Sequence, residues 1–373
     1  MRRRALTGAL AALVTASTLC ATTAQAAEAA PSSAPPRLAE PGGDRPIGLA
    51  TLHLVDDDRA DPWVAVERRE LMVSVWYPAR EPSDRPAPYM TAAESATYLE
   101  AGGIPLPPDT LTTVVTHATV DAEPVRARAG LPLVVLSPGF GMPRATLTGL
   151  AEELASRGYV VAGIGHNHEA DGITFPDGRT TDCVVCDDPD HAAVGEARAA
   201  DVSLVLDELT GASPAWEHGE LIDADRVAMV GHSAGGYSTI PTLLSDPRVR
   251  AAVNMDGNFR YPNDIPVDRP VLMWGQPSHV PGGPDPTWDE TWAELTGWKR
   301  WLSVDGTEHL SFTDVAPLGD QLGIPVQELA GDRADALTRA YVTAFLDHHL
   351  RGWHARLLDG PSACCPEVRF HRP

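Results

Sequence analysis

The chain has 373 residues and a formal net charge of −22 at pH 7. This excess of acidic residues disfavours nucleic acids and anionic membrane surfaces as partners, because both carry negative charge themselves. The length allows one large α/β domain or two small ones, and no internal repeat is visible. Composition therefore excludes classes of partner without identifying a substrate.

The first 26 residues have the pattern of a secretory signal peptide. Three arginines at positions 2–4 precede an apolar run, and residues 24–26 (AQA) fit a small-residue cleavage site. No later stretch is apolar enough to span a membrane, so we expect an exported protein without stable membrane insertion. The arginines leave both general and twin-arginine export open. Residues 27–45 are rich in Pro, Ala and Ser, which predicts a flexible lead-in to a single domain over residues 46–373.

Short apolar segments alternate with amphipathic ones along this domain. Strands are expected at residues 71–77, 132–136, 159–164, 226–230, 249–255, 270–274 and 299–304. Helices with one apolar face are expected around 147–154, 202–209 and 337–345, and directly after residue 233. This alternation predicts an α/β fold with a mostly parallel central sheet and helices on both faces.

The Pro-rich segment 82–128 departs from the alternation. It contains one plausible short helix, around residues 92–101. We interpret the segment as an insertion, which either covers the active site or is an ordinary surface extension.

Gly231-His232-Ser233-Ala234-Gly235 has the G-x-S-x-G pattern between an expected strand and an expected helix. In such a sharp turn, side chains two positions on either side of the serine would collide, so glycine is needed at both places. The serine is then presented at the tip of a nucleophile elbow. A Gly-rich turn without chemistry is the alternative, but the strand and helix on either side favour Ser233 as a nucleophile.

A serine hydroxyl needs a base to take its proton, and the base needs a carboxylate to orient it. In an open parallel sheet both partners should follow later strands, in the chain order Ser, Asp, His. Asp256 and His309 each follow an expected strand closely. The alternatives are that Asp256 only forms an Asp-Gly turn and that His309 is an ordinary surface histidine. If Asp256 is not the acid, Asp285 and Asp305 are the other candidates. If the base is a histidine, activity should fall on acidification when it takes up a proton.

The tetrahedral intermediate of ester cleavage needs backbone N–H donors for its oxyanion. One donor is expected from Ala234, the residue after the nucleophile. The other is expected from the Gly-containing loop at residues 138–141, with Phe140 favoured over Gly141.

Two tryptophans and one histidine are candidate substrate contacts. Trp288 and Trp292 are four residues apart and share one face of a short helix, in the segment between the strands that carry the acid and the base. They either pack in the core or border an aromatic acyl slot opposite Phe140, which would favour short to medium acyl chains. His166 and His168 follow a strand, and we expect a pocket-wall or structural role for them, since no third metal ligand stands out.

Four cysteines follow the leader: Cys183, Cys186, Cys364 and Cys365. In an oxidising compartment they suggest up to two disulfides with three possible connectivities, and we expect no free thiol. The C-x-x-C spacing also admits a redox centre or half a zinc site. Local pairing of Cys183 with Cys186 is favoured, because it closes a short loop.

These motifs together resemble the plasma-type platelet-activating factor acetylhydrolase family of α/β-hydrolases and the bacterial lipases and esterases grouped with it. The resemblance runs from about Leu71 to about Leu350 and includes LVVLSPGFG, RVAMVGHSAGG, the aspartate after VRAAVNM, and GTEHLSFTD. It implies cleavage of small-molecule or lipid esters without a metal or organic cofactor, with the acid at the early position that Asp256 occupies. Pro138 and Phe140 replace the histidine and leucine of the family's usual His-Gly-Leu-Gly loop, which bears on the acyl preference.

The sequence therefore predicts a secreted serine carboxylesterase or lipase that uses Ser233, His309 and Asp256 and forms an acyl-enzyme intermediate. Polyester hydrolysis and peptidase activity on the same fold are alternatives within the same chemistry. A binding protein that kept the fold without the chemistry is the alternative from another class. The order and spacing of the three groups argue against it.

Overall fold

The computed structural model describes residues 34–260 and 265–372. The predicted signal peptide and residues 27–33 of the predicted lead-in lie outside the described residues. The rest of the lead-in is not free: Leu38 is buried and its N–H donates to Val115 O at 3.0 Å. The expected flexible segment and the domain start at residue 46 are therefore wrong for residues 34–45, which belong to the same compact unit as the rest of the described chain.

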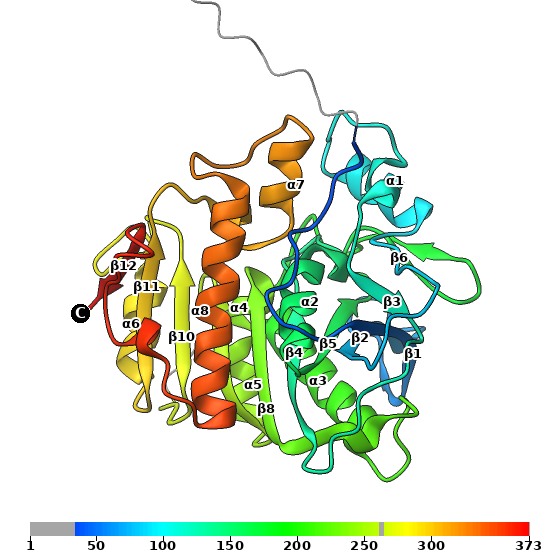
Figure 1. Cartoon of the computed structure of the whole chain (residues 1–373), viewed down its shortest axis with the longest axis horizontal. Coiled ribbons are helices and arrows are strands. Elements are labelled where there is room, and N and C mark those ends of the chain that lie inside the picture. Colours follow the sequence, from blue (N-terminus) through cyan, green and yellow to red (C-terminus); the bar gives the residue numbers. More distant parts are fainter. Residues whose placement is uncertain (1–33, 261–264, 373) are drawn as a thin grey trace, which may run out of the picture. The chain divides into compact units, whose positions relative to one another are not determined.

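Ten strands of the described chain form one sheet, in the order β12-β11-β10-β9-β8-β4-β5-β2-β1-β3 (Figure 1). Their bounds are β1 Ile47–Ala60, β2 Arg68–Pro78, β3 Ala118–Val120, β4 Leu131–Ser137, β5 Val160–His166, β8 Ile222–His232, β9 Val249–Met255, β10 Val271–Gly275, β11 Lys299–Val304 and β12 Val368–His371. Neighbouring strands from β5 through β4, β8, β9 and β10 to β11 are parallel. All the predicted strands lie in this sheet, and the mostly parallel architecture is confirmed. A separate small hairpin joins β6 (Ile173–Thr174) to β7 (Thr180–Thr181).

Helices cover both faces of the sheet, as Figure 1 shows with α8 in front and α3 and α5 behind. On one face, α2 (Thr148–Ser156) and α8 (Gly331–Arg351) bury their apolar side chains against the strands. On the other face the sheet is covered by α3 (His191–Thr210), α5 (Thr239–Ser245) and α6 (Pro286–Glu294). The apolar stripes that predicted the helices are the stripes that pack, so the two hydrophobic layers follow directly from the sequence periodicity.

The segment 82–128 extends the edge of the sheet. Its strand β3 pairs in parallel with β1, which itself pairs with β2. Its helix α1 (Ala92–Ala101) begins with a capping box between Thr91 and Glu94, as the short predicted helix requires. Leu99 of α1 packs in the same apolar cluster as Leu318 of α7 (Val315–Gln321).

The strand order reverses at β4. From β4 the chain passes to β5 on one side and then crosses back to β8 on the other side. A reversal of this kind leaves a crevice beyond the carboxyl ends of the strands, where α/β proteins bind ligands. The loop after β4 and the turn after β8 therefore meet at the place where a site is expected.

A buried ionic network supports the start of β2. The Arg69 guanidinium lies 3.0 Å from Asp61, 3.1 Å from Glu169 and 2.5 Å from Asp201, and all four side chains are fully buried. Burial raises the pKa of the Asp201 and Glu169 carboxyls, but nearby Arg69 and Arg198 outweigh it and hold both below their ordinary values. These carboxylates therefore stabilise the folded chain in their ionised form.

Acid should weaken the fold through this network. The contribution of Asp201 is fully present above the unfolded-state pKa of about 4 and is lost as the pH falls toward the lower folded-state value. Asp201→Asn should cost about 3–5 kcal/mol in the free energy of unfolding at pH 7, because it leaves Arg69 underpaired. Urea unfolding at several pH values should show this difference shrinking below about pH 4, with exposed Asp268→Asn as the control. An undiminished difference at pH 3 would contradict the account.

Candidate active site

The turn after β8 is a strained strand-to-helix elbow. Ser233 has φ 52° and ψ −114°, a backbone conformation that residues other than glycine rarely adopt. A Cβ on Gly231 would lie 2.0 Å from Gly235 O, and one on Gly235 would lie 2.0 Å from Ser137 O. Both clashes are with backbone and cannot be relieved by a side-chain rotation. The two glycines are thus needed for the reason that the sequence pattern suggested, and helix α4 (Ala234–Tyr237) begins at the next residue.

Ser233, His309 and Asp256 form a continuous hydrogen-bond chain. His309 Nε2 lies 2.8 Å from Ser233 Oγ, and His309 Nδ1 lies 2.6 Å from Asp256 Oδ2. Asp256 directly follows β9, and His309 opens a short 3-10 helix (His309–Phe312) after β11. The structure thus brings the three predicted residues together within the reach that proton transfer requires.

The environment of Asp256 favours its charged form. Burial raises the pKa of the Asp256 carboxyl, but hydrogen bonds from His279 and His309 outweigh burial and hold this pKa below its ordinary value. An ionised Asp256 keeps the proton of neutral His309 on Nδ1, which leaves Nε2 free to accept one from Ser233. The His309 side chain is 45% exposed, so substrate can approach it.

His232, the residue before the nucleophile in the elbow, contacts both the backbone and the ring of His309. Its Nε2 lies 2.8 Å from the His309 carbonyl oxygen, and the two rings have centroids 4.8 Å apart. Burial, followed by the nearby charge of His309, lowers the pKa of His232 to about 3. His232 is therefore neutral at physiological pH and donates to the backbone of His309.

Ser233 opens into a small cavity with a volume of about 210 Å³. Its walls are partly aromatic and carry one arginine. The lining residues are Phe140, His191, Ser233, Ala234, Tyr237, Asn258, Arg260 and His309. None of them comes from segment 82–128, which packs at the sheet edge, so of the two interpretations of this segment the structure favours the surface extension.

Both predicted oxyanion donors line the cavity. Ala234 begins α4, so its N–H has no acceptor within the helix. The Phe140 N–H has no hydrogen-bond acceptor in the described part of the chain. Gly141, the alternative donor, is already engaged, since its N–H donates to Glu169 O at 2.9 Å. The geometry therefore favours Phe140 over Gly141, as predicted.

A search of solved structures finds an esterase with a similar fold and sequence. A ferulic acid esterase from Streptomyces cinnamoneus is similar to this chain with a TM-score of 0.82 and 44% sequence identity, over 91% of this chain and 100% of that one. The chain belongs to the α/β-hydrolase esterases. The family model of platelet-activating factor acetylhydrolase, isoform II, also matches residues 105–182. The predicted family resemblance and the prediction of an ester-cleaving enzyme are thereby confirmed.

Curated relatives agree over shorter lengths. A probable 1-alkyl-2-acetylglycerophosphocholine esterase of Arthroderma benhamiae is 27% identical over 267 residues, which are 65% of this chain and 66% of the relative. A bis(hydroxyethyl) terephthalate hydrolase of Streptomyces coelicolor is 33% identical over 147 residues, 38% of each chain. The esterase thus matches less than two thirds of the length of these relatives.

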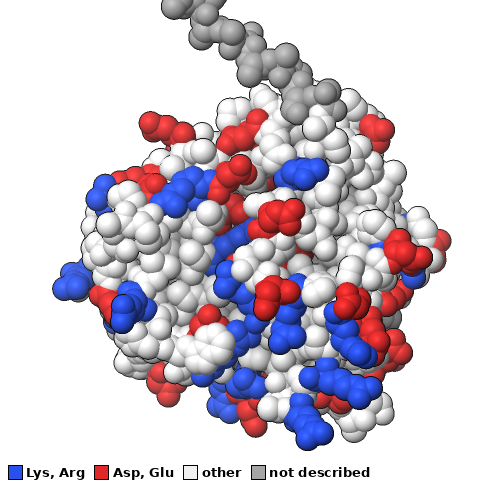
Figure 2. Space-filling model, in the orientation of Figure 1, with Lys and Arg blue, Asp and Glu red and all other residues white. Residues whose placement is uncertain are grey.

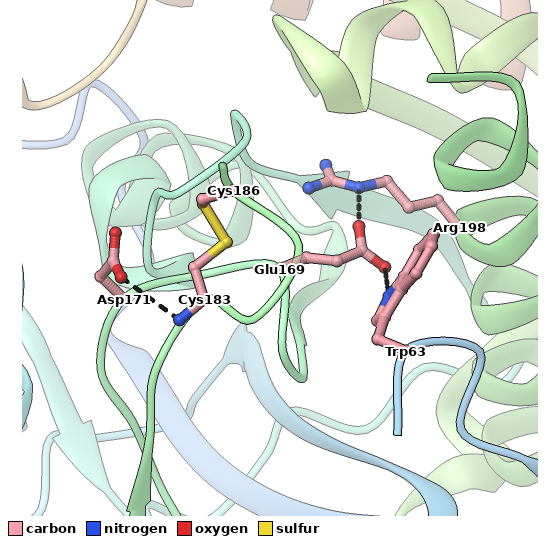
Figure 3. The surroundings of a disulfide bond; sticks show 6 residues. All are labelled: Trp63, Glu169, Asp171, Cys183, Cys186 and Arg198. Atoms are coloured by element: carbon pink, nitrogen blue, oxygen red, sulfur yellow. Dashed lines mark hydrogen bonds and ion pairs between the residues drawn. A yellow bond between two sulfur atoms is a disulfide. The ribbon is translucent and has the colours of Figure 1, made fainter. Parts of the chain in front are cut away.

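A buried arginine anchors the loop after β4 in the esterase. Arg198 of α3 donates to Pro138 O at 2.5 Å. It also pairs with Glu169 at 2.8 Å, and Trp63 donates its indole N–H to the same carboxylate at 3.0 Å (Figure 3). Arg198 and Glu169 are almost completely buried. The backbone beside Phe140 is therefore fixed by charge-assisted hydrogen bonds, which are stronger than neutral ones. No motif or residue spacing in the sequence pointed to Arg198.

The predicted disulfide between Cys183 and Cys186 is present. It lies beside the oxyanion loop. Asp171 accepts a hydrogen bond from Cys183 N–H at 3.2 Å (Figure 3). Asp171 also donates its own backbone N–H to Gly141 O at 3.2 Å. The disulfide loop thus supports the far end of the loop that Arg198 anchors at Pro138. A bonded pair also leaves neither sulfur as a thiolate ligand for zinc.

The expectation of no free thiol is wrong for the other two cysteines. Cys364 is exposed, Cys365 is buried, and neither forms a disulfide in the described chain. Adjacent Cα atoms lie about 3.8 Å apart, less than the roughly 4.4–6.8 Å that disulfides usually span. Because Cys183 and Cys186 already pair with each other, the described residues hold no further cysteine with which Cys364 or Cys365 could pair.

Trp288 and Trp292 do not border the cavity, so their predicted role as substrate contacts is wrong. Trp288 is fully buried and stacks on His279, with ring centroids 4.3 Å apart. Trp292 packs beside Trp301, and Lys299 Nζ lies 4.3 Å from its ring centroid. Their shared helix face turns toward the sheet, which was the alternative interpretation of the four-residue spacing.

His166 is also not a substrate contact, since its side chain is buried and lies outside the cavity lining. Its two ring nitrogens lie 2.9 Å from Ser137 Oγ and 2.8 Å from Asp201. His168 likewise bonds to Glu67, at 3.1 Å. Both histidines have the structural role that the sequence left open.

Within residues 34–260 and 265–372, no three His, Cys, Asp or Glu side chains are grouped to hold a metal ion. No helix of the described chain is both long and apolar enough to cross a membrane. Figure 2 shows basic and acidic side chains interspersed over the face viewed, so the net negative charge does not form a single patch there.

The oxyanion loop can be tested with two matched glycines. Gly141 has φ 75°, and Gly178, in the exposed β6–β7 turn, has φ 87°. Alanine at either position should cost about 1 kcal/mol of stability, because both need the left-handed region. Only Gly141→Ala should also lower kcat for a simple ester, by about 10- to 100-fold, since it displaces the Phe140 N–H. Equal kcat values for the two variants would contradict a role for this loop.

Proposed function

We propose that this esterase is an exported serine carboxylic-ester hydrolase with Ser233 as nucleophile, His309 as base and Asp256 as the orienting acid. The single observation that carries the proposal is the hydrogen-bond chain from Ser233 Oγ through His309 to Asp256 at the head of the cavity. Export is supported by the leader-like residues 1–26 and is consistent with the disulfide.

The reaction follows from this chain. As Ser233 Oγ attacks the ester carbonyl carbon, His309 Nε2 takes the hydroxyl proton and Asp256 stabilises the resulting imidazolium. The carbonyl oxygen becomes an oxyanion, to which the N–H groups of Phe140 and Ala234 donate. His309 then returns the proton to the departing alkoxide, leaving the acyl group on Ser233. Water repeats the sequence with His309 as base, which releases the acid and restores the serine.

The cavity favours compact acyl groups. Its volume of about 210 Å³ is bounded by Phe140, Tyr237 and His191, so a slot with aromatic walls is present, although not the one that the tryptophans suggested. We propose short to medium aliphatic esters as substrates, with compact aromatic acyl esters as a second candidate. The second is supported by the aromatic walls and by the 44% identity to the ferulic acid esterase. Polyester cleavage is supported only by partial matches to cutinases and to the terephthalate-ester hydrolase, over less than half of this chain.

The triad should behave as one unit. Ser233→Ala and His309→Ala should each lower kcat for p-nitrophenyl butyrate by about 10⁴-fold or more, and the double variant should be no worse than either. Asp256→Asn should cost about 10³- to 10⁴-fold, because it disturbs the tautomer of His309. A fluorophosphonate should label the wild type at Ser233.

The labelling control is Ser245→Ala, an exposed serine on α5 whose hydroxyl donates to Pro241 O. This variant should be labelled and active like the wild type. Unlabelled wild-type protein would favour a binding protein without catalysis, and near-normal turnover in folded Ser233→Ala or His309→Ala would refute the triad.

Acyl length gives a test of the cavity. Each methylene buried is worth about 0.8 kcal/mol, so kcat/KM should rise only until the slot is full. Among p-nitrophenyl acetate, butyrate, octanoate and palmitate we expect a maximum at short to medium length and a decline at palmitate. Phe140→Ala should move the maximum to longer chains while keeping its backbone donor, and Trp292→Phe should leave it unmoved. Rates that climb to palmitate and rise sharply on anionic vesicles would instead indicate an interfacial lipase.

A further inference from the structure

A second histidine contacts the carboxylate that orients His309. His279, in the loop after β10, places Nδ1 2.8 Å from Asp256 Oδ1, while His309 bonds to Oδ2. The Gln276 N–H also donates to Oδ1, at 2.7 Å. His279 is only 5% exposed and is absent from the cavity lining, so it acts on Asp256 without meeting substrate.

The other ring nitrogen of His279 also faces an acceptor. Nε2 lies 3.2 Å from Asn258 Oδ1 and 3.4 Å from Asp285 Oδ2. That Asp285 oxygen is buried and has no hydrogen-bond partner in the described chain. A neutral imidazole has one N–H, and an ionised carboxylate only accepts. With a carboxylate on each side, His279 can serve both only as an imidazolium.

The surrounding residues hold this ring in place. Trp288 stacks on it with an interplanar angle of 10°, and Trp301 donates its indole N–H to the His279 carbonyl oxygen at 2.9 Å. Helix α6 supplies both Trp288 and its N-cap residue, Asp285. The charged groups facing the His279 ring are therefore Asp256 on one side and Asp285 on the other. Asn258, Trp288 and Trp301 are neutral.

We propose that His279 is a positioning residue for ester hydrolysis. As a cation shared between Asp256 and Asp285, it fixes the plane of the Asp256 carboxylate and offsets part of its negative charge. His309 is then oriented by Asp256, while the positive charge of His279 opposes a second positive charge on the nearby His309. This role rests on the proposed triad of Ser233, His309 and Asp256.

Loss of this positive charge should leave a distinctive kinetic signature. With the full charge of Asp256 facing His309, the protonated base becomes more stable and the acidic limb of kcat/KM should move to higher pH, by about one unit. The plateau kcat should fall about tenfold as the geometry loosens. KM should stay the same, because His279 does not line the cavity.

The sharpest variant is Asp285→Asn, compared with Asp289→Asn on the same helix. Asparagine caps a helix about as well as aspartate, so Asp285→Asn removes the charge that retains the second proton on His279 but preserves the fold. Asp289 instead accepts from Gly282 N–H at 2.9 Å, away from the triad. His279→Asn, which keeps an amide donor toward Asp256, and His279→Leu, which does not, complete the set. Thermal unfolding confirms that each variant is folded.

Rate profiles from pH 5 to pH 9 with p-nitrophenyl butyrate should show the acidic limb displaced upward in Asp285→Asn and in both His279 variants, but not in Asp289→Asn. The kcat of His279→Asn should exceed that of His279→Leu. In the wild type, ¹⁵N NMR of the imidazole rings should show an imidazolium at pH 7 whose signal is missing from His279→Asn.

Unshifted profiles in the folded Asp285 and His279 variants, or a neutral His279 ring at pH 7, would overturn the positioning role. If Ser233→Ala is inactive in the same assays, the proposed function would still stand. Turnover that survives in folded Ser233→Ala would overturn the triad and this inference together.

Discussion

The buried carboxylate of Asp256 is the group on which the site depends. It lies at the end of β9 with φ 59°, and its N–H donates to Trp274 O at 2.8 Å in the neighbouring strand. Its side chain receives hydrogen bonds from the loops after β10 and β11, through His279 and His309. A carboxylate buried this deeply is tolerated only when its oxygen atoms accept hydrogen bonds. Asp256 therefore holds the ends of three adjacent strands, β9, β10 and β11, in one arrangement.

The elbow and the triad order could be predicted because their constraints are local or topological. The turn at Ser233 needs glycine at 231 and 235 for backbone reasons that any homologous turn would share. The acid and the base must follow strands, because only the carboxyl ends of parallel strands reach the crevice. The short apolar runs that alternate with amphipathic segments likewise predicted the central strands. It missed β1, β3 and β12, which lie at or next to the edges of the sheet.

The substrate contacts could not be predicted in the same way. A four-residue spacing puts Trp288 and Trp292 on one face of α6 but does not say whether that face meets the sheet or the cavity. His279 and Arg198 carry no sequence motif, since their partners are far away in the chain: Arg198 meets Pro138 60 residues earlier. Contacts of that range follow from packing, which sequence patterning does not resolve.

The oxyanion loop and the orienting acid of the proposed reaction centre are both held by buried, charge-assisted hydrogen bonds. The oxyanion loop is held by Arg198 paired with Glu169, and the orienting acid is flanked by His279 between two carboxylates. Apolar packing alone fixes volume but not the direction of a donor, whereas buried charge-assisted hydrogen bonds fix both at some cost in stability. An ester-cleaving site needs direction, because an N–H or an imidazole displaced by about 1 Å loses much of its effect. In this chain, two groups of buried charges lie directly behind the oxyanion loop and the orienting acid, the groups whose direction the reaction requires.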